Sequence, residues 1–268
     1  MQGEALAAVV HTLGGAGFEA ALQDWLGTVA APDSVLGLAF GADGPPVVLL
    51  RQSREARVFA RLEAAYLGGA YLLDPFHALH LRRAQAGVYR LRDVAPDAFG
   101  KSRYHDEYYR DTTLLDEIVF VARPAEAVTV MLCLGRDAAS GQAFGAAEVA
   151  ACEAVAPVVV ALVERHWHGL AVTGRGAGDV AAALIAAAAA RGTKLSRRQA
   201  EVALMILRGH STASIALALG VSPQTVKVFR RQLYARCGLS SQGELFALML
   251  PLLAGQVSVA VRTDRAAP

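Results

Sequence analysis

The chain has 268 residues, of which 54% are hydrophobic and 19% are charged, and its formal net charge is +2. These values indicate a globular protein of one or two domains and exclude a disordered chain. The most apolar runs, 155–163 and 181–190, are shorter than the about 20 residues of a membrane span, and the N-terminus lacks signal-peptide features. Cys133, Cys152 and Cys237 have neither disulfide nor metal spacing, which favours a reduced, cytoplasmic compartment.

The first 168 residues predict helices and strands in an irregular order. Apolar residues recur at helical spacing in some segments, and β-branched runs bounded by turn residues mark strands in others. Helices are expected at 1–31, 56–73, 76–85 and 146–167, and strands at 35–40, 47–50, 88–92, 118–123 and 128–134. The order lacks the strict alternation of a doubly wound parallel sheet. We therefore expect an α+β protein whose N-terminal domain is an α/β/α sandwich similar to GAF and PAS sensor domains.

The C-terminal region predicts four short helices, because cap residues mark their ends. Ser196 with Gln199, and Ser241 with Glu244, have the spacing of a capping box. Glycines suited to helix C-termini and serines suited to N-termini mark the other ends: Gly209, Ser211, Gly220 and Ser222, with Pro223 at a first helical position. A three-residue turn between the second and third helices is typical of a helix-turn-helix.

The third of these helices has two distinct faces. Val226, Phe229 and Leu233 are spaced to face a core. The opposite stripe, which we expect to face outward, consists of Gln224, Lys227, Val228 and Arg231. An outward basic stripe on a helix is either a solvated surface or a DNA-binding surface.

Charge favours DNA. Residues 194–253 hold 8 Lys and Arg against 2 Asp and Glu, whereas residues 1–168 hold 14 against 20, so a polyanion partner is indicated for the C-terminal module alone. In the major groove, Lys227 and Arg231 would donate to guanine N7 and O6, and Val228 would contact a thymine methyl group. The remaining DNA-binding candidates are better placed for phosphates: Ser222, Thr225 and Arg230.

The module resembles the LuxR/FixJ (GerE-type) DNA-binding domain over about 60 residues. The resemblance rests on Leu195-Ser-x-Arg-Gln-x-Glu-Val202, Gly209, Ser211, Ile215-Ala216, Leu219-Gly-Val-Ser222, Thr225-Val-Lys227, Leu233, Arg236 and Gly238-Leu239. Two departures are Phe229, where relatives often carry histidine, and Gln242-Gly243, which replaces a common Arg-x pair. The resemblance implies a transcription regulator that dimerises through its last helix, here by Leu245, Leu248, Met249 and Leu252.

Regulators of this type are controlled by a receiver domain or by a ligand-binding domain. The acidic pocket and phosphoacceptor aspartate of a receiver are missing near the N-terminus, which disfavours phosphorylation. The segment from Tyr66 to Asp74-Pro75 is similar to part of the autoinducer-binding domain of quorum-sensing LuxR proteins, in which the aspartate binds the amide of an acyl-homoserine lactone. Arg57 and Arg61 stand near the position of that family's tryptophan.

A wider set of aromatic and acidic residues suggests a second ligand class. The set consists of Tyr71, Asp74, Phe76, Tyr104, Tyr108, Tyr109, Asp116 and Glu117. Together these side chains could enclose an organic cation through cation–π attraction and ion pairing. The preferred hypothesis is therefore a small amine, with an acyl-homoserine lactone as the alternative. Each residue could also belong to an ordinary amphipathic surface.

A metal-dependent enzyme fused to the DNA-binding module is a weaker alternative. His77 and His80 have helical spacing and His105 follows later, but further ligands at a recognisable spacing are missing. The sequence also lacks a glycine-rich phosphate loop and a Gly-x-Ser-x-Gly elbow. We expect a protein that is not an enzyme and that needs neither a metal nor another cofactor.

The expected organisation is a ligand-sensing domain at 1–168, a helical linker at 169–192, a DNA-binding domain at 193–253 and a tail at 254–268. The linker centres on the glycine-rich run 174–178, and within the tail 257–261 would form a strand or stay mobile. The expected partners are double-stranded DNA, a small-molecule effector and a second copy of the chain, with no membrane. The expected location is the cytoplasm, in association with the nucleoid.

Overall fold

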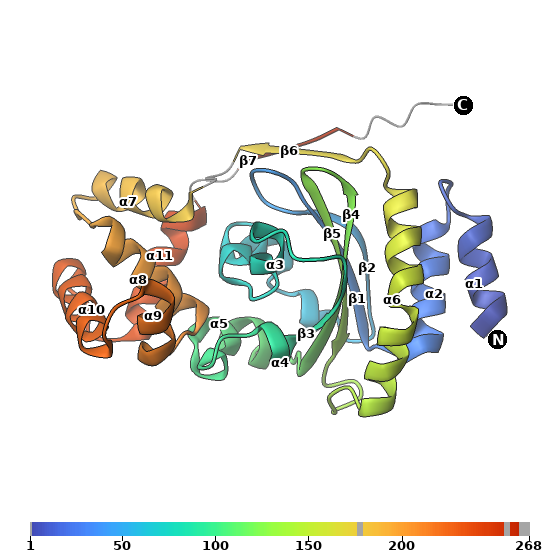
Figure 1. The fold of residues 1–268 in the computed structure, drawn as a ribbon, viewed down its shortest axis with the longest axis horizontal. Helices are drawn as coiled ribbons and strands as arrows, with labels where there is room; N and C mark the ends of the chain where they lie inside the picture. Colours follow the sequence, from blue (N-terminus) through green and yellow to red (C-terminus); the bar gives the residue numbers. More distant parts are fainter. Residues whose placement is uncertain (1, 176–178, 255–257, 263–268) are drawn as a thin grey trace.

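A computed structural model describes residues 2–175, 179–254 and 258–262. An antiparallel sheet with helices on one face and short helical turns on the other forms the N-terminal part, and a helical module follows it (Figure 1). The expectation of an α+β protein with an α/β/α N-terminal domain is confirmed.

The sheet has five strands in the order β2-β1-β5-β4-β3, and every neighbouring pair is antiparallel. Its strands are β1 (Ser34–Phe40), β2 (Val47–Ser53), β3 (Gly87–Arg90), β4 (Asp116–Ala125) and β5 (Val128–Arg136). The five strands expected from β-branched runs are all present. Because side chains alternate along a strand, β4 directs Phe120 to one face and Val119 to the other.

Long helices cover one face of the sheet: α2 (Phe18–Ala30) and α6 (Ala146–His166), with α1 (Gln2–His11) outside α2 (Figure 1). Their apolar side chains form a closed core with those from the strands, including Leu22, Phe120 and Leu132. The single helix expected over 1–31 is wrong. Gly14 and Gly17 adopt positive φ angles of 78° and 90°, so the chain breaks there into two helices.

Helix α6 is long and apolar enough, by length and composition alone, to cross a membrane. The run 155–163, which alone is too short for a membrane span, is part of this longer helix. In the fold, α6 packs lengthwise on β4 and β3 and against α2, and its residues Val159 and Val163 are buried there. The apolar character of this helix is therefore used in covering the sheet.

The other face of the sheet is covered by short turns in place of the helix expected over 56–73. The turns are η1 (Ala56–Phe59), η2 (Leu62–Tyr66), η3 (Ala70–Leu73), α3 (His77–Leu81), α4 (Leu91–Val94), η4 (Phe99–Lys101), α5 (Arg103–His105) and η5 (Asp106–Arg110). Gly69 lies between η2 and η3 with φ of 143°, and it interrupts the helical periodicity of the segment that contains η1, η2 and η3. Such irregular cover leaves polar side chains free to point at the sheet.

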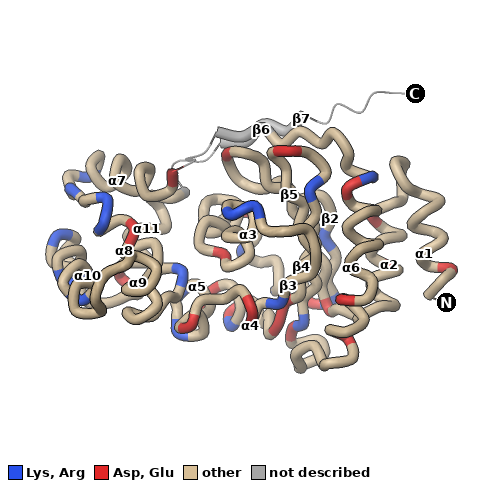
Figure 2. The backbone as a smooth tube through the Cα atoms, in the orientation of Figure 1, with Lys and Arg blue, Asp and Glu red and all other residues tan. Residues whose placement is uncertain are grey.

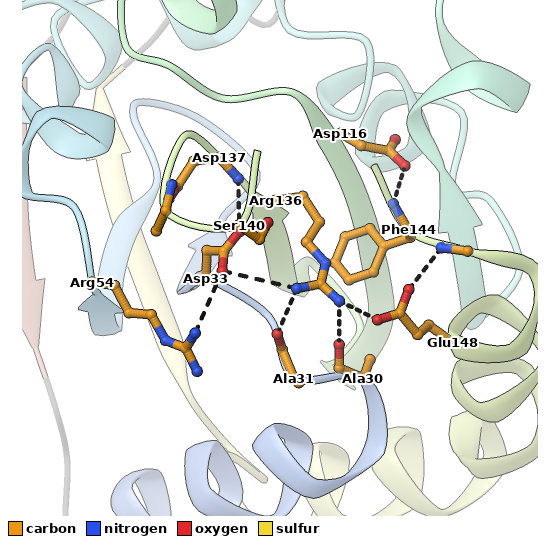
Figure 3. A network of polar contacts seen from close by, with 12 residues as sticks. Ala30, Ala31, Asp33, Arg54, Asp116, Arg136, Asp137, Ser140, Phe144 and Glu148 are labelled. Atoms are coloured by element: carbon orange, nitrogen blue, oxygen red, sulfur yellow. Dashed lines mark hydrogen bonds and ion pairs between the residues drawn. The ribbon is translucent and has the colours of Figure 1, made fainter. Parts of the chain in front are cut away.

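A buried arginine fastens the helical layer to the sheet (Figure 3). The guanidinium of Arg136, at the end of β5, donates to the carbonyls of Ala31 and Ala30 at 2.9 and 3.2 Å and pairs with Glu148 of α6. Its Nη1 also lies 3.8 Å from the fully buried carboxylate of Asp33. Carbonyls at the end of α2 attract a cation, so one side chain joins α2, β5 and α6.

The helical module consists of α7 (Val180–Ala190), α8 (Arg197–Arg208), α9 (Thr212–Leu219), α10 (Pro223–Cys237) and α11 (Gln242–Ala254). The predicted caps of α8, α9 and α10 are present, since Ser196, Ser211 and Ser222 each accept from a backbone N–H three residues on. At α11 the expected capping box is incomplete: Ser241 caps the helix, but the Glu244 carboxylate accepts from Ser240.

The expected linker and the expected tail both contain a β-strand. The expected helical linker 169–192 contains strand β6 (Ala171–Arg175) before α7, and β6 pairs with β7 (Ser258–Arg262) of the expected tail. Of the glycine-rich run 174–178, residues 176–178 lie outside the described residues, as does Val257. Helix α7 packs on α8 and α11 and so belongs to the helical module.

Candidate ligand-binding and DNA-binding sites

A cavity lies between the sheet and the short turns that cover it. About 80 Å³ within it is open to the centres of water-sized molecules, room for several waters or a small organic group. Its floor comes from the strands and its walls come from η1, η2, α5 and η5. The lining residues are Ser34, Leu36, Leu38, Val58, Phe59, Arg61, Leu62, Tyr66, Asp74, Tyr104, Tyr108, Tyr109, Thr112, Leu114, Glu117, Cys133 and Gly135.

Strand register brings the floor residues together. Leu36 of β1 lies opposite Cys133 of β5, and Glu117 of β4 lies opposite Gly135. A side chain at Gly135 would collide with the hydroxyl of Ser34. Glycine at this position therefore keeps the end of the cavity open beside the Glu117 carboxyl.

Asp74 is held at the end of η3 by hydrogen bonds to both of its carboxyl oxygens. The hydroxyl of Tyr66 donates to its Oδ2 and the backbone N–H of Phe76 donates to its Oδ1, each at 2.7 Å. Burial nevertheless raises the pKa of Asp74 above its usual range, although the hydrogen bonds to its carboxyl act to lower it. Burial and then the nearby Asp74 charge raise the pKa of Tyr66 well above its usual range. The carboxyl is thus pre-positioned but poorly solvated.

Glu117 is the second acidic group in the cavity. Its Oε2 accepts from the hydroxyl of Tyr109 at 2.8 Å. Burial, followed by repulsion from Asp74, raises the pKa of Glu117 to about 8. Burial and the Asp74 charge therefore both favour the protonated form of Glu117. A cation placed between Glu117 and Asp74 would favour its ionised form.

Tyrosine rings line the cavity beside these carboxyls. Tyr104 stacks on Tyr108 with ring centres 4.6 Å apart, and Tyr66 meets Tyr108 edge-on at 6.3 Å. The hydroxyl of Tyr108 is buried and makes no hydrogen bond within the described residues. A buried hydroxyl without a partner is costly, so this one is available to a ligand.

An arginine closes the rim. Arg61 lies 3.1 Å from the carboxylate of Glu107 and 3.9 Å from that of Asp111. Arg103 contacts Glu107 as well, at 2.9 Å. These ion pairs join η2 to α5 and η5 across the opening. Because Arg61 is already paired with acids at the rim, its charge is not directed at the carboxyls inside.

Five of the eight predicted ligand-binding residues line the cavity: Asp74, Tyr104, Tyr108, Tyr109 and Glu117. The other three do not line it. Tyr71 and Phe76 are buried in the neighbouring core, and Asp116 accepts from the backbone N–H of Phe144 at 3.1 Å on the far side of β4 (Figure 3). Sequence reasoning assigned no ligand contact to Tyr66, Arg61 or Cys133. The eight-residue spacing of Tyr66 and Asp74 was a signal that could have found the first of these.

Of the three histidines considered for metal binding, His77 and His80 stack with ring centres 5.8 Å apart, but His105 lies elsewhere. His80 is within 2.9 Å of the Thr129 hydroxyl, whereas His105 stacks on Tyr109. His77 is buried, and burial lowers its pKa well below the usual range. Within residues 2–175, 179–254 and 258–262, no group of three or more His, Cys, Asp or Glu residues is arranged to hold a metal.

Helix α10 presents its two faces as the spacing predicts. Val226 and Leu233 are buried, and Phe229 is half-buried against the module core. The outward stripe is exposed over its whole length, at Gln224, Lys227, Val228 and Arg231. Of the residues expected to contact phosphates, Ser222 and Arg230 are exposed and Thr225 is half-buried. Lysines and arginines predominate over acids on α8 to α10 (Figure 2).

Residues 193–249 match the family model described as bacterial regulatory proteins, luxR family. An HTH-type transcriptional regulator from the exeN 3′ region of Aeromonas salmonicida is 32% identical over 185 residues, which is 66% of this chain and 93% of the relative. The chain belongs to the LuxR family of transcription regulators. Its C-terminal module is the family's helix-turn-helix DNA-binding domain.

Solved structures extend the likeness of this LuxR-family protein to its N-terminal domain. The ligand-binding domain of VqsR from Pseudomonas aeruginosa matches with a TM-score of 0.53 and 27% identity, over 62% of this chain and 96% of VqsR. SdiA from Escherichia coli matches over 86% of this chain and 89% of SdiA, with 13% identity and a TM-score of only 0.38. The VqsR match shows that the sheet domain has the fold of a LuxR-type ligand-binding domain, and the cavity lies within it.

Proposed function

We propose that this LuxR-type regulator is controlled by a small organic amine that binds between Asp74 and Glu117. One observation carries the proposal: two buried carboxyls share a tyrosine-lined cavity, and burial together with their mutual repulsion raises the pKa of Glu117 to about 8. A cation between them relieves that repulsion, and tyrosine faces attract it as well.

The amine would bind mainly by replacing water in a preformed site. The Tyr66 and Tyr109 hydroxyls already hold the two carboxyls in place, so little ordering is needed when the ligand enters. The unpartnered Tyr108 hydroxyl would accept from the ammonium group or donate to a polar atom on the ligand. Leu36, Leu38 and Leu62 offer an apolar wall for a short carbon chain.

An acyl-homoserine lactone is the second candidate, supported by the Tyr66–Asp74 hydrogen bond followed by Pro75. A neutral amide would donate to Asp74 without requiring Glu117 to ionise. The two ligand classes therefore differ in pH dependence. Amine affinity should rise as the pH passes through about 8, because Glu117 then loses its proton, whereas lactone affinity should not.

Melting temperatures of the purified full chain would test the proposal. We expect one or more primary or quaternary alkyl amines to raise the melting temperature by roughly 5 to 10 °C at about 100 times Kd. Asp74→Asn should abolish this shift. Asp93→Asn, an exposed carboxylate outside the cavity, is the matched control and should keep it. No shift with any amine, together with a shift by an acyl-homoserine lactone, would overturn the proposal in favour of the second candidate.

We propose that two copies of the chain bind a near-palindromic DNA site as a dimer. Helix α10 of each copy is the recognition helix, and the two helices lie about 34 Å apart. Lys227→Ala and Arg231→Ala should each weaken specific binding by about 1 to 3 kcal/mol, measured on a duplex selected from a random library by the wild-type protein. Gln232→Ala, exposed on the same helix, is the control. Unchanged affinity in both stripe variants would refute the placement of α10 in the groove.

A further inference from the structure

A second cavity lies where the ligand-binding domain meets the helix-turn-helix. About 240 Å³ within it is open to the centres of water-sized molecules, which is room for a phosphate group. Ala98 and Lys101 of the ligand-binding domain contribute one wall, and residues of the module, among them Thr212 and Arg230, contribute the rest. The residues that line this cavity are all different from those that line the candidate ligand cavity. The two domains thus form a separate opening together.

Backbone contacts fix the position of η4 against the module. The backbone N–H of Ala98 donates to the carbonyl of Gly209 at 2.9 Å. Gly209 has φ of +90°, and a Cβ there would lie 2.7 Å from the Cα of Phe99, so glycine permits this close approach. Phe99 and Ser102, on the two sides of Lys101, are both buried. The backbone of Lys101 is therefore held in place, although its side chain is exposed.

Three donor side chains at this cavity have no hydrogen-bonding partner. Within residues 2–175, 179–254 and 258–262, Lys101 and Thr212 make no side-chain hydrogen bond or ion pair, and the guanidinium of Arg230 lies over the Tyr234 ring, 5.2 Å from its centre. The two cations repel each other across the opening, and an anion between them would relieve that repulsion. Ammonium, guanidinium and hydroxyl groups are the usual side-chain donors to phosphate oxygens.

The acidic residue that contacts the module at this point is Asp97. Its carboxylate accepts from the backbone N–H of Ser211 at 2.9 Å, and hydrogen bonds from Ser211 lower the pKa of Asp97. Its charge is therefore directed to the start of α9. The residues that line the cavity include two cations and no carboxylate, so a phosphate that enters is attracted by both.

The position of Arg230 on α10 favours DNA as the source of the phosphate. Arg230 comes three residues after Lys227 of the outward stripe, so the two side chains are neighbours on the helix surface. Phosphates border the major groove, so a helix in the groove brings its flanks close to them. Exposed cations hold a free phosphate weakly, because water solvates both partners, whereas the rest of α10 already brings a DNA phosphate close.

We propose that Lys101 of the ligand-binding domain joins Arg230 and Thr212 of the helix-turn-helix in binding the phosphate backbone of one DNA strand. The DNA-binding surface thus extends beyond the helical module onto η4. Contacts to phosphates carry no sequence information, but they set the affinity and its dependence on salt. The Lys101 contact rests on the proposed placement of α10 in the groove, but not on the identity of the ligand at Asp74.

Binding of full-length variants to duplex DNA at several salt concentrations tests the contact. Lys101→Ala removes the cation at the cavity. Arg92→Ala is the control with the same change in net charge, since Arg92 is an exposed cation of the same domain that lies 3.7 Å from Asp93. We expect Lys101→Ala to bind about twofold to fivefold more weakly than Arg92→Ala, equally on a selected and on a random duplex. It should also lower the slope of log K against log salt by about 1 for each bound copy.

Equal affinities and slopes in Lys101→Ala and Arg92→Ala would overturn the contact. If Lys227→Ala and Arg231→Ala still weaken specific binding in that case, the placement of α10 in the groove stands and only the role of Lys101 is refuted. Loss of affinity in Lys101→Ala together with unchanged affinity in both stripe variants would instead support a phosphate contact and refute the groove placement.

A charge-retaining variant separates the charge of Lys101 from its packing. Lys101→Arg keeps the charge and should bind within about twofold of the wild type, with the same salt slope. Lys101 is exposed and bonds to none of the described residues, so both substitutions should leave the melting temperature unchanged. If Lys101→Arg bound as weakly as Lys101→Ala, the lost affinity would not come from the charge, and a phosphate contact would be contradicted.

Discussion

The two faces of the five-stranded sheet are covered in different ways, although the same strands supply both. Helices α2 and α6 close one face with an apolar core. The other face is covered by short turns that leave a cavity holding Asp74 and Glu117. Regular helices bury apolar surface efficiently, whereas irregular turns place individual polar groups at chosen points. The helix-covered face therefore contributes more to stability, whereas the cavity face is less tightly packed and contains the candidate ligand site.

The largest expected effect concerns the arginine that joins the helices to the sheet. Arg136→Ala should lower the free energy of unfolding by about 3 to 5 kcal/mol, because it removes the buried cation beside Asp33 and leaves the Glu148 carboxylate and the Ala30 and Ala31 carbonyls without this donor. Arg54→Ala is the control, since Arg54 lies 3.7 Å from the same carboxylate but is 66% exposed. Its cost should stay below about 1 kcal/mol. Urea unfolding measures both, and equal costs would contradict the assigned role.

A matched pair of leucines compares the two faces directly. Leu132 of β5 is 1% exposed in the helix-covered core, and Leu132→Ala should cost about 2 to 5 kcal/mol. Leu36 of β1 already borders the open cavity, so Leu36→Ala should cost only about 1 kcal/mol, since less packing is lost there. Urea unfolding would contradict the comparison if the Leu36 variant were the less stable.

Glu117 should give the cavity face a pH dependence. Its pKa is raised by burial to about 8, so the folded protein retains a proton that the unfolded chain releases. Stability should therefore be highest below the unfolded pKa and fall as pH rises toward 8, by at most about 1.4 kcal/mol per pH unit. Glu117→Gln should flatten this part of the profile, measured by unfolding between pH 5 and about 8. If stability falls with pH as steeply in Glu117→Gln as in the wild type, another group causes the pH dependence.

The smallest expected effect is the loss of one hydroxyl on the cavity face. Tyr66→Phe removes the donor to Asp74 but keeps the ring, and it should cost about 0.5 to 1.5 kcal/mol. Tyr89→Phe, whose hydroxyl donates to the Gln85 carbonyl at an exposed site, is the comparison and should cost less. Thermal unfolding with and without a bound amine would show whether the Tyr66 variant loses affinity as well.

Local signals predicted the DNA-binding module well, within limits. Serine caps, glycine C-termini and helical spacing act within one turn, so α8 to α10 were found with their faces. Apolar type alone does not give burial, however: Leu217 is 86% exposed, because α9 is short and packs through Ile215 and Ala216. The turns over 56–73 were mistaken for a helix, since their apolar spacing is helical and only Gly69 indicates the break.

The sequence by itself determined the LuxR-type module, the strands and much of the acidic and aromatic set, because those depend on periodicity and residue type. Tertiary structure decided which of that set share a cavity, since Tyr66, Glu117 and Cys133 meet only through sheet register and the packing of turns. It also decided the high pKa of Glu117, which burial causes. The contact between Asp97 and Ser211 joins residues 114 positions apart, and no local pattern encodes it.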